Sequence, residues 1–204
     1  MSRPRLAGLL AVLALLATAL VLGARGAQPA ATPGLDARPA ALSQELQQAR
    51  VAAALPSCPQ GLSTGLPALR LPCMAGGPDV DVSGAPGRPT LVNIWGTWCG
   101  PCVREVPLLV KFAATAGDRV AVLGVATEDS PASVYAFAKA VGVNYPQLRD
   151  DMGEVLRHFA SYGAGVPKTV LVRADGSIAY VQVGELTSLA AVQAVVADHL
   201  GVRL

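Results

Sequence analysis

The sequence has few of the residues that hold metal ions in proteins. Its 204 residues include four cysteines and two histidines, and its single Cys-x-x-Cys motif is accompanied by no second one and by no His-x-x-x-His. A zinc site needs four ligands, which usually come in closely spaced pairs. The candidates outside the motif are not paired at close spacing: Cys58, Cys73, His158 and His199. We therefore expect no metal site and no bound cofactor.

The sequence also lacks an excess of charge of either sign. Its net charge is +2 at pH 7, from 16 basic and 14 acidic side chains. Proteins that bind nucleic acids without regard to sequence rely on a strongly basic surface, and so small a balance offers none. We expect no nucleic-acid partner.

One long apolar segment lies near the N-terminus. Residues 6–24 contain no charged side chain and follow Arg3 and Arg5. About 19 apolar residues nearly span a hydrocarbon core of about 30 Å and exceed the usual signal-peptide core of about 7 to 15 residues. We expect residues 1–25 to be an uncleaved membrane anchor, with the rest of the chain outside the cytoplasm because positive charges stay inside. A cleaved signal peptide, which would release a secreted soluble form, is the alternative, since residues 24–26 fit a small-x-small cleavage site.

Residues 26–55 follow, and their composition shifts to alanine, proline, glutamine and arginine. Pro29, Pro33 and Pro39 break any early helix. A short helix over residues 43–50, capped by Ser43, is compatible with the pattern, but its apolar residues are mostly alanine and would bury little surface. We expect a flexible tether that acts as a spacer, and a docking helix is the alternative. Residues 56–204 are expected to form one domain of ordinary size.

The Cys-x-x-Cys motif of Cys99 and Cys102 lies between a predicted strand and a predicted helix. Residues 90–95 are a short apolar, β-branched run, and residues 103–116 have apolar side chains at helical spacing. Cys99 would then stand at a helix N-terminus, where free N–H groups and the helix dipole favour a thiolate and lower a thiol pKa from about 8.5 toward 7. We expect Cys99 to attack and Cys102 to resolve the mixed disulfide. Half of a zinc site, or a structural bridge, is the alternative.

Three further features resemble a particular family. Trp-Cys-Gly-Pro-Cys at residues 98–102 resembles the active site of the thioredoxin superfamily. The run from Cys102 to Pro107, with Glu105 three residues after Cys102, is similar to the Cys-x-x-Glu-x-Pro of its membrane-tethered TlpA/ResA/CcmG branch. Residues 165–169, Gly-Val-Pro-Lys-Thr, resemble the loop that carries the superfamily's cis-proline. Asn93 occupies the place where thioredoxin itself has a buried acid, which argues against plain thioredoxin. The resemblance covers residues 56–204.

The resemblance implies an α/β fold: a thioredoxin-like three-layer sandwich with a mixed central sheet, helices on both faces and an N-terminal β extension. The local patterns predict an added edge strand within residues 61–72 and a β-hairpin that joins residues 79–82 to the central strand at 90–95. Further elements are predicted at residues 119–126 (strand), 130–142 (helix), 145–150 (strand), 152–162 (helix), 168–173 and 177–183 (hairpin) and 186–200 (helix).

The resemblance also assigns roles near the two cysteines. Glu105 is expected beneath the Cys102 thiol, with a pKa raised by burial, so that it trades a proton with Cys102. A surface carboxylate paired with Arg104 or Lys111 is the alternative. Trp98 is expected to face the partner protein. Val166 and Pro167 would present a backbone edge to an extended client peptide.

Cys58 and Cys73 form the second cysteine pair. In an exported protein an even cysteine count indicates disulfide bridges. Their bond would close a loop of about 15 residues, contribute about 3 kcal/mol in the chain-entropy model and staple the N-terminal extension to the sheet. A second redox relay and two free thiols are the alternatives.

These inferences together predict an enzyme, an extracytoplasmic thiol:disulfide oxidoreductase that reduces or exchanges disulfides of exported proteins. The Gly-Pro pair between the cysteines matches reducing thioredoxin, so the direction is expected to be reductive, with the cysteines of apocytochrome c among its targets. The resemblance implies a CcdA-like membrane protein as electron donor. A disulfide-forming oxidase of the same fold and a non-catalytic client-binding module are the alternatives.

Overall fold

The computed structural model describes residues 37–204 except residue 64, and the side chains of residues 37–41 are left out of this description. The predicted anchor or signal segment, residues 1–25, and the first part of the predicted tether lie outside the described residues. Among the helices of residues 37–63 and 65–204, none has the length and hydropathy needed to cross a bilayer.

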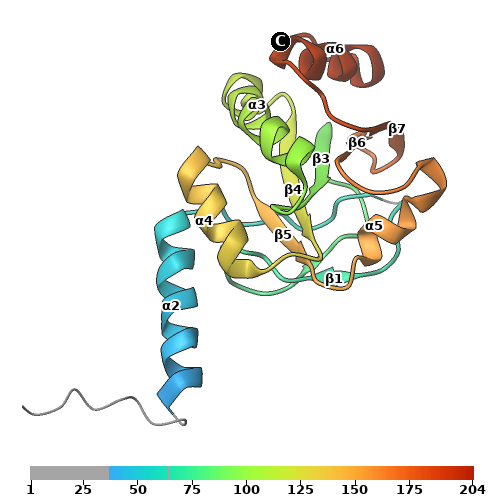
Figure 1. Ribbon diagram of the computed structural model, residues 1–204. Coiled ribbons are helices and arrows are strands. Elements are labelled where there is room, and N and C mark those ends of the chain that lie inside the picture. Colours follow the sequence, from blue (N-terminus) through green and yellow to red (C-terminus); the bar gives the residue numbers. More distant parts are fainter. Residues whose placement is uncertain (1–36, 64) are drawn as a thin grey trace, which may run out of the picture. The chain divides into compact units, whose positions relative to one another are not determined.

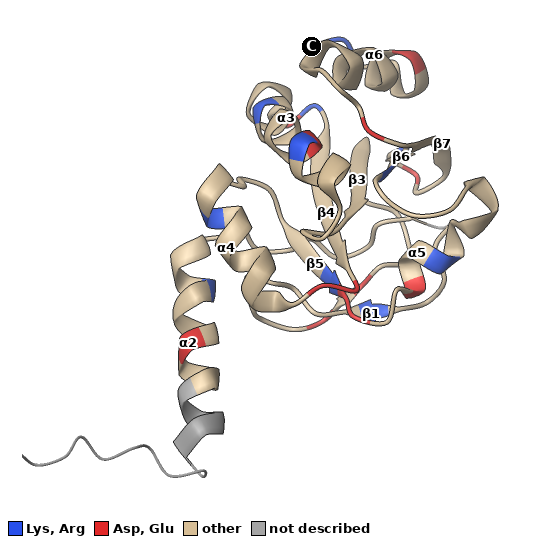
Figure 2. Ribbon diagram, in the orientation of Figure 1, with Lys and Arg blue, Asp and Glu red and all other residues tan. Residues whose placement is uncertain are grey.

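A five-stranded mixed sheet, with the strand order β5-β4-β3-β6-β7, forms the centre of the domain (Figure 1). The strands are β3 (Thr90–Trp95), β4 (Ala121–Thr127), β5 (Gln147–Asp150), β6 (Lys168–Val172) and β7 (Ile178–Val183). Strands β3, β4 and β5 run parallel, whereas β6 and β7 are antiparallel to their neighbours. The two strands β3 and β4 carry no charged residue (Figure 2), as expected for parallel strands that are covered on both faces.

Helices cover both faces of this sheet. The helical elements of the described chain are α2 (Ala37–Ala53), α3 (Gly100–Ala116), α4 (Pro131–Val141), α5 (Glu154–His158), the 3₁₀ turn η1 (Ala160–Tyr162) and α6 (Leu189–Leu200). Residues of α3, α4 and α6 share one hydrophobic cluster with the sheet, and residues of α5 share the other. The predicted α/β sandwich is therefore confirmed.

The region before β3 differs from its prediction. The expected edge strand is β1 (Arg70–Leu71), and it pairs antiparallel with β2 (Val80–Asp81) in a separate two-stranded sheet. The predicted hairpin between residues 79–82 and the central strand is therefore wrong. The physical reason is that β4 and β6 already occupy both edges of β3, which leaves no free edge for β2.

Helix α2 also differs from the predicted tether. It begins at Ala37 rather than at Ser43, and Pro39 falls in its first turn, where a missing N–H costs no hydrogen bond. Near its end, Ala49, Ala53 and Leu55 join the hydrophobic cluster on the α3 face. Residues 43–204 form one compact unit, which includes the stretch from 43 to 55.

Candidate active site

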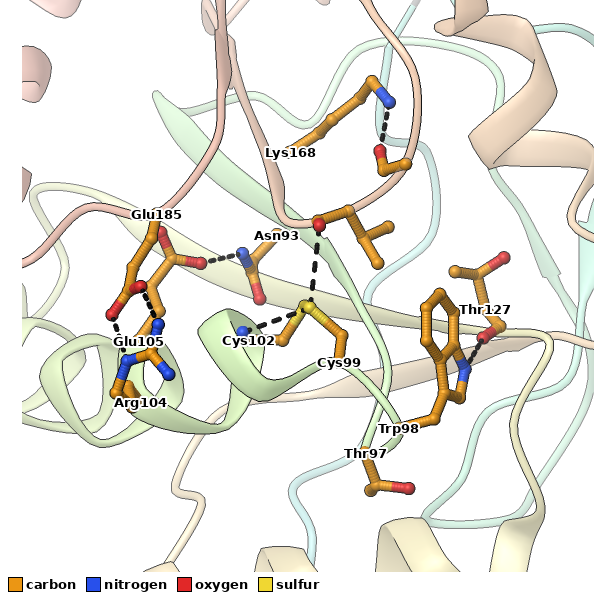
Figure 3. Close-up of a disulfide and its surroundings, with 12 residues drawn as sticks. Asn93, Thr97, Trp98, Cys99, Cys102, Arg104, Glu105, Thr127, Lys168 and Glu185 are labelled. Carbon is orange, nitrogen blue, oxygen red and sulfur yellow. Dashed lines mark hydrogen bonds and ion pairs between the residues drawn. A yellow bond between two sulfur atoms is a disulfide. The ribbon is translucent and has the colours of Figure 1, made fainter.

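Cys99 and Cys102 are joined in a disulfide at the point where the chain leaves the sheet and enters α3 (Figure 3). Cys99 is the N-cap of α3, and its sulfur accepts the backbone N–H of Cys102 at 3.2 Å. Cys99 is 7% exposed and Cys102 is fully buried. The Cys99 sulfur is therefore the more accessible of the two, and it lies at the positive end of a helix of 17 residues.

The turn before Cys99 is anchored from the neighbouring strand end. Asp129, just after β4, accepts the backbone N–H of Thr97 at 2.5 Å and its hydroxyl at 2.9 Å. A Cβ at Gly96 would lie 2.5 Å from the Trp98 indole nitrogen, so a larger residue there would displace the Trp98 side chain. The sequence patterns predicted no site role for Thr97 or Asp129. The available signal is the acidic pair at residues 128 and 129, which directly follows a parallel strand, at the sheet edge where site loops gather.

The proline loop lies against the cysteines. The Val166–Pro167 peptide bond is cis, and the Val166 carbonyl oxygen lies 3.6 Å from the Cys99 sulfur. The side chain of Lys168 donates to the carbonyl of Gly165, and the Gly184 N–H donates to the carbonyl of Pro167 at 3.0 Å. The loop is thus held from both sides, with the Val166 carbonyl beside the Cys99 sulfur.

The two tryptophans near the motif have different surroundings. Trp98 is 53% exposed, and its indole N–H donates to the Thr127 carbonyl at 3.3 Å. Trp95 is fully buried and donates to the Gln147 side chain at 3.0 Å. Trp98 therefore presents a large apolar face to solvent beside Cys99, whereas Trp95 belongs to the core.

Glu105 is a buried carboxylate and not a surface one. The residue is fully buried, its Oε1 accepts the Leu186 backbone N–H, and its Oε2 accepts the Asn93 side-chain N–H, both at 2.8 Å. Burial raises its pKa from 4.5 to about 7, although these two hydrogen bonds act in the opposite direction. Arg104, the alternative partner, instead binds Glu185 through two hydrogen bonds (Figure 3). Within the described residues, the hydrogen bonds of Glu105 do not include the Cys102 sulfur.

Cys58 and Cys73 form the second disulfide. Cys73 makes an isolated β-bridge with Leu148 on β5, and the Cys58 sulfur lies 3.4 Å from the Gln147 carbonyl oxygen. This disulfide thus ties the segment before β1 to the edge of the main sheet.

Metal-ligating side chains do not gather elsewhere in the described chain. Residues 37–63 and 65–204 contain no group of three or more His, Cys, Asp or Glu side chains placed to hold a metal ion. The ring of His158 contacts the Gly65 carbonyl at 2.6 Å, and that of His199 stacks on Tyr180 with 3.8 Å between centroids. Each histidine ring therefore contacts a protein group that is not a metal ligand.

A sheet with helices on both faces, and a Cys-x-x-Cys centre opposite a cis-proline, define a thioredoxin-like protein. The Redoxin family matches residues 62–196, and this chain belongs to that family as a TlpA/ResA/CcmG-like member of the thioredoxin superfamily.

Individual relatives agree with this assignment. The thiol-disulfide oxidoreductase ResA of Bacillus subtilis is 30% identical over 112 residues, which cover 54% of this chain and 62% of ResA. The thiol:disulfide interchange protein HelX of Rhodobacter capsulatus is 35% identical over 123 residues, which cover 59% of this chain and 67% of HelX. A thioredoxin family thiol:disulfide interchange protein from Chlorobium tepidum superposes with a TM-score of 0.54 at 26% identity, over 72% of this chain and 99% of that one. The enzyme class expected from the sequence is the class named for these relatives.

Proposed function

We propose that this protein is an extracytoplasmic thiol:disulfide oxidoreductase that reduces or exchanges disulfides of exported proteins. The observation that carries the proposal is the position of Cys99. Its sulfur caps a long helix, accepts a backbone N–H and lies beside the Val166 carbonyl, at the edge where an extended peptide can pair. The named activities of ResA and HelX support the same chemistry.

The reaction begins from the reduced dithiol. The Cys99 thiolate attacks one sulfur of the client disulfide, forms a mixed disulfide and releases the first client thiolate. The Cys102 thiol then loses its proton and attacks the Cys99 sulfur, which releases the second client thiolate and leaves the Cys99–Cys102 disulfide. Two electrons pass from the protein to the client, and two protons go to the two client thiolates.

We assign Glu105 to the step in which the Cys102 thiol loses its proton. A carboxyl with a pKa of about 7 is partly protonated near neutral pH, so it can both take up and return a proton. Because Cys102 lies one helical turn before Glu105, the proton passes from the Cys102 thiol to Glu105 directly or through water.

The location and the partners belong to the same proposal. Arg3 and Arg5 followed by an uncharged apolar run support export of the domain. An exported reductase needs electrons from across the membrane, and a CcdA-like membrane protein would re-reduce Cys99 and Cys102. Clients would be exported proteins with cysteines or disulfides, apocytochrome c among them.

The redox state of Cys99 and Cys102 in growing cells tests the direction of the reaction. Thiol trapping in the native host, with the full chain, is expected to find the pair mostly reduced. A mostly oxidised pair would overturn the reductase in favour of an oxidase. If the purified protein has no disulfide exchange activity, the alternative function, a non-catalytic client-binding module, would be favoured instead.

A further inference from the structure

A row of polar residues crosses the α3-facing side of the sheet, which is otherwise apolar. Asn93 on β3 pairs in register with Gly124 on β4 and with Thr169 on β6, and Gly124 pairs with Gln147 on β5. Residues in register point to the same face, so these positions lie side by side beneath α3. Asn93, Thr169 and Gln147 are all fully buried.

Gly124 makes room for this row. A Cβ at Gly124 would lie 2.0 Å from the Gln147 side-chain oxygen, so the Gln147 amide lies across the glycine. The same oxygen accepts the Trp95 indole N–H. The row is therefore tightly packed on the β5 side, where the Gln147 side chain lies against the sheet.

Three side-chain atoms of the row have no hydrogen-bond partner among the described residues: Asn93 Oδ1, the Thr169 hydroxyl and Gln147 Nε2. The first two belong to residues that are register partners on β3 and β6. A buried polar atom without a hydrogen bond costs about 1 to 3 kcal/mol, so two such atoms on neighbouring positions call for an explanation. Because register partners in antiparallel strands have Cβ atoms about 4.5 to 5.5 Å apart, these two groups can reach each other.

The two oxygens of the Glu105 carboxyl have different partners. Oε1 accepts from the Leu186 backbone N–H, which can only donate, whereas Oε2 faces the Asn93 amide. A proton on Oε1 would weaken the hydrogen bond from Leu186, because the hydroxyl oxygen of a carboxyl accepts more weakly than its carbonyl oxygen. Protonation of Glu105 is therefore favoured on Oε2, toward Asn93.

A primary amide can serve both states of such a carboxyl. It carries a donor and an acceptor at the same distance from Cβ, and rotation by 180° exchanges them with little change in shape. A hydroxyl such as that of Thr169 can likewise donate or accept.

We propose that Asn93 is a positioning residue that reverses its side-chain amide whenever Glu105 gains or loses a proton, and that Thr169 binds the end of the amide that Glu105 does not use. With Glu105 ionised, Asn93 Nδ2 donates to Oε2 and the Thr169 hydroxyl donates to Oδ1. With Glu105 protonated, its O–H donates to Oδ1 and the Thr169 hydroxyl accepts from Nδ2. The carboxyl keeps its hydrogen bonds in both forms. This inference rests on the proposed function, in which Glu105 changes its protonation state in every cycle.

The other charged and titratable groups around Glu105 do not hydrogen-bond its carboxyl among the described residues, whereas the neutral Asn93 does. Glu185, ahead of α6, repels the ionised carboxyl, but Arg104 on α3 pairs with Glu185. Tyr145, ahead of β5, is buried, and its pKa is raised by that burial and by Glu105. Cys99 and Cys102 complete the surroundings on α3. An amide at position 93 adds no charge of its own, so it supports both states of Glu105.

Nuclear magnetic resonance of the oxidised protein tests the inference without client or reductant. The chain has two asparagines, Asn93 and Asn144, so ¹⁵N-asparagine labelling yields two side-chain amide signals. The Asn93 signals are expected to move with pH at the same midpoint as the Glu105 carboxyl carbon. Asn144, which is exposed and bonds the Val110 carbonyl, is the internal control and should not follow that midpoint. An Asn93 amide that stays constant while Glu105 titrates would overturn the inference.

A matched pair of variants sharpens this test. Asn93→Leu removes the hydrogen bond that Asn93 makes to either form of the carboxyl. Because the bond to the ionised form is charge-assisted and the stronger of the two, the pKa of Glu105 should rise by about one pH unit, and the pH profile of disulfide exchange should shift with it. Thr90→Val is the control, because Thr90 is buried on the same strand but faces the opposite side of the sheet. A folded Asn93→Leu variant with an unchanged Glu105 midpoint would contradict the inference. If that variant does not fold, the amide titration of the unmodified protein decides.

The two proposals can fail separately. The titrations need no enzymatic activity, so a protein that exchanges no disulfides but shows coupled Asn93 and Glu105 titrations would refute only the proposed function. If the protein is an active oxidoreductase but its Asn93 amide signals do not change with the titration of Glu105, only this inference is refuted.

Discussion

The two disulfides of this domain have similar burial but different surroundings. Cys99 is 7% exposed and Cys73 is 9% exposed, while Cys58 is partly exposed. A backbone carbonyl oxygen lies near each accessible sulfur, that of Val166 at 3.6 Å from Cys99 and that of Gln147 at 3.4 Å from Cys58, and the Cys99 sulfur also accepts a backbone N–H at the start of a helix. A thiolate is stabilised by such a donor and by a positive helix end. Hydrogen-bond surroundings, more than exposure, thus separate the reactive pair from the structural pair.

The removal of Cys99 should have the largest effect on activity. Cys99→Ser is expected to reduce insulin disulfide reduction to the uncatalysed rate, because it removes the sulfur that lies at the helix N-terminus. Cys102→Ser should instead accumulate a mixed disulfide between Cys99 and the client, visible by mass spectrometry. Multiple turnover by Cys102→Ser without a trapped adduct would contradict the two-step assignment.

The removal of the second pair should affect stability but not chemistry. The double variant Cys58→Ser and Cys73→Ser opens a loop with a sequence separation of 15 residues, which should lower the free energy of unfolding by about 3 kcal/mol in denaturant titrations. The insulin reduction rate of the folded variant should match that of the unmodified protein. A parallel loss of activity would make this pair a relay, and the contrast between the disulfides would disappear.

The pH dependence of stability should reveal the buried Glu105. Its pKa in the folded state is about 7, above the ordinary 4.5. A raised pKa means that its contribution to stability is fully present below about pH 4.5 and is lost as the pH rises to about 7. That loss amounts to about 3 kcal/mol.

Glu105→Gln should remove this pH dependence, so the difference in free energy of unfolding between the two proteins should change across pH 4.5 to 7 in denaturant titrations. Glu128→Gln is the matched control, since that side chain lies in the loop after β4. Glu105→Gln should also slow disulfide exchange. Parallel pH profiles for Glu105→Gln and the unmodified protein would show that the carboxyl titrates normally.

The smallest expected effect concerns client docking. Trp98→Ala removes an indole that is 53% exposed beside Cys99, and KM for a disulfide-containing peptide should rise about fivefold, equivalent to about 1 kcal/mol. Val51→Ala, at a similarly exposed side chain on α2, should leave KM unchanged. Equal effects of the two substitutions would argue against a docking role for Trp98.

Local sequence patterns predicted most of the elements around the site. The apolar run at residues 90–95 coincides with β3, and Ser130, Gly142 and Ser188 cap α4 and α6 close to the predicted bounds. The predicted helix over residues 152–162 is instead divided into α5 and η1. Local signals succeed where capping and periodicity act within a few residues.

Local sequence patterns could not predict which strands pair or which residues surround Glu105. The alternation at residues 79–82 indicates a strand but not its partner, and β2 pairs with β1 because β3 has no free edge. The anchoring of Thr97 by Asp129 joins residues that are 32 positions apart. Such contacts depend on which strands become neighbours.

The sequence by itself determined the reactive motif, its place between a strand and a helix, and the second cysteine pair. These follow from residue type and short spacing, since about 3.6 residues per helical turn and alternation along a strand are local rules. The tertiary structure alone decided that the buried Glu105 lies between Asn93 and the Leu186 N–H, and that Asn93, Gly124, Thr169 and Gln147 form one row. The register of separate strands sets those contacts, and register results from the packing of the whole sheet.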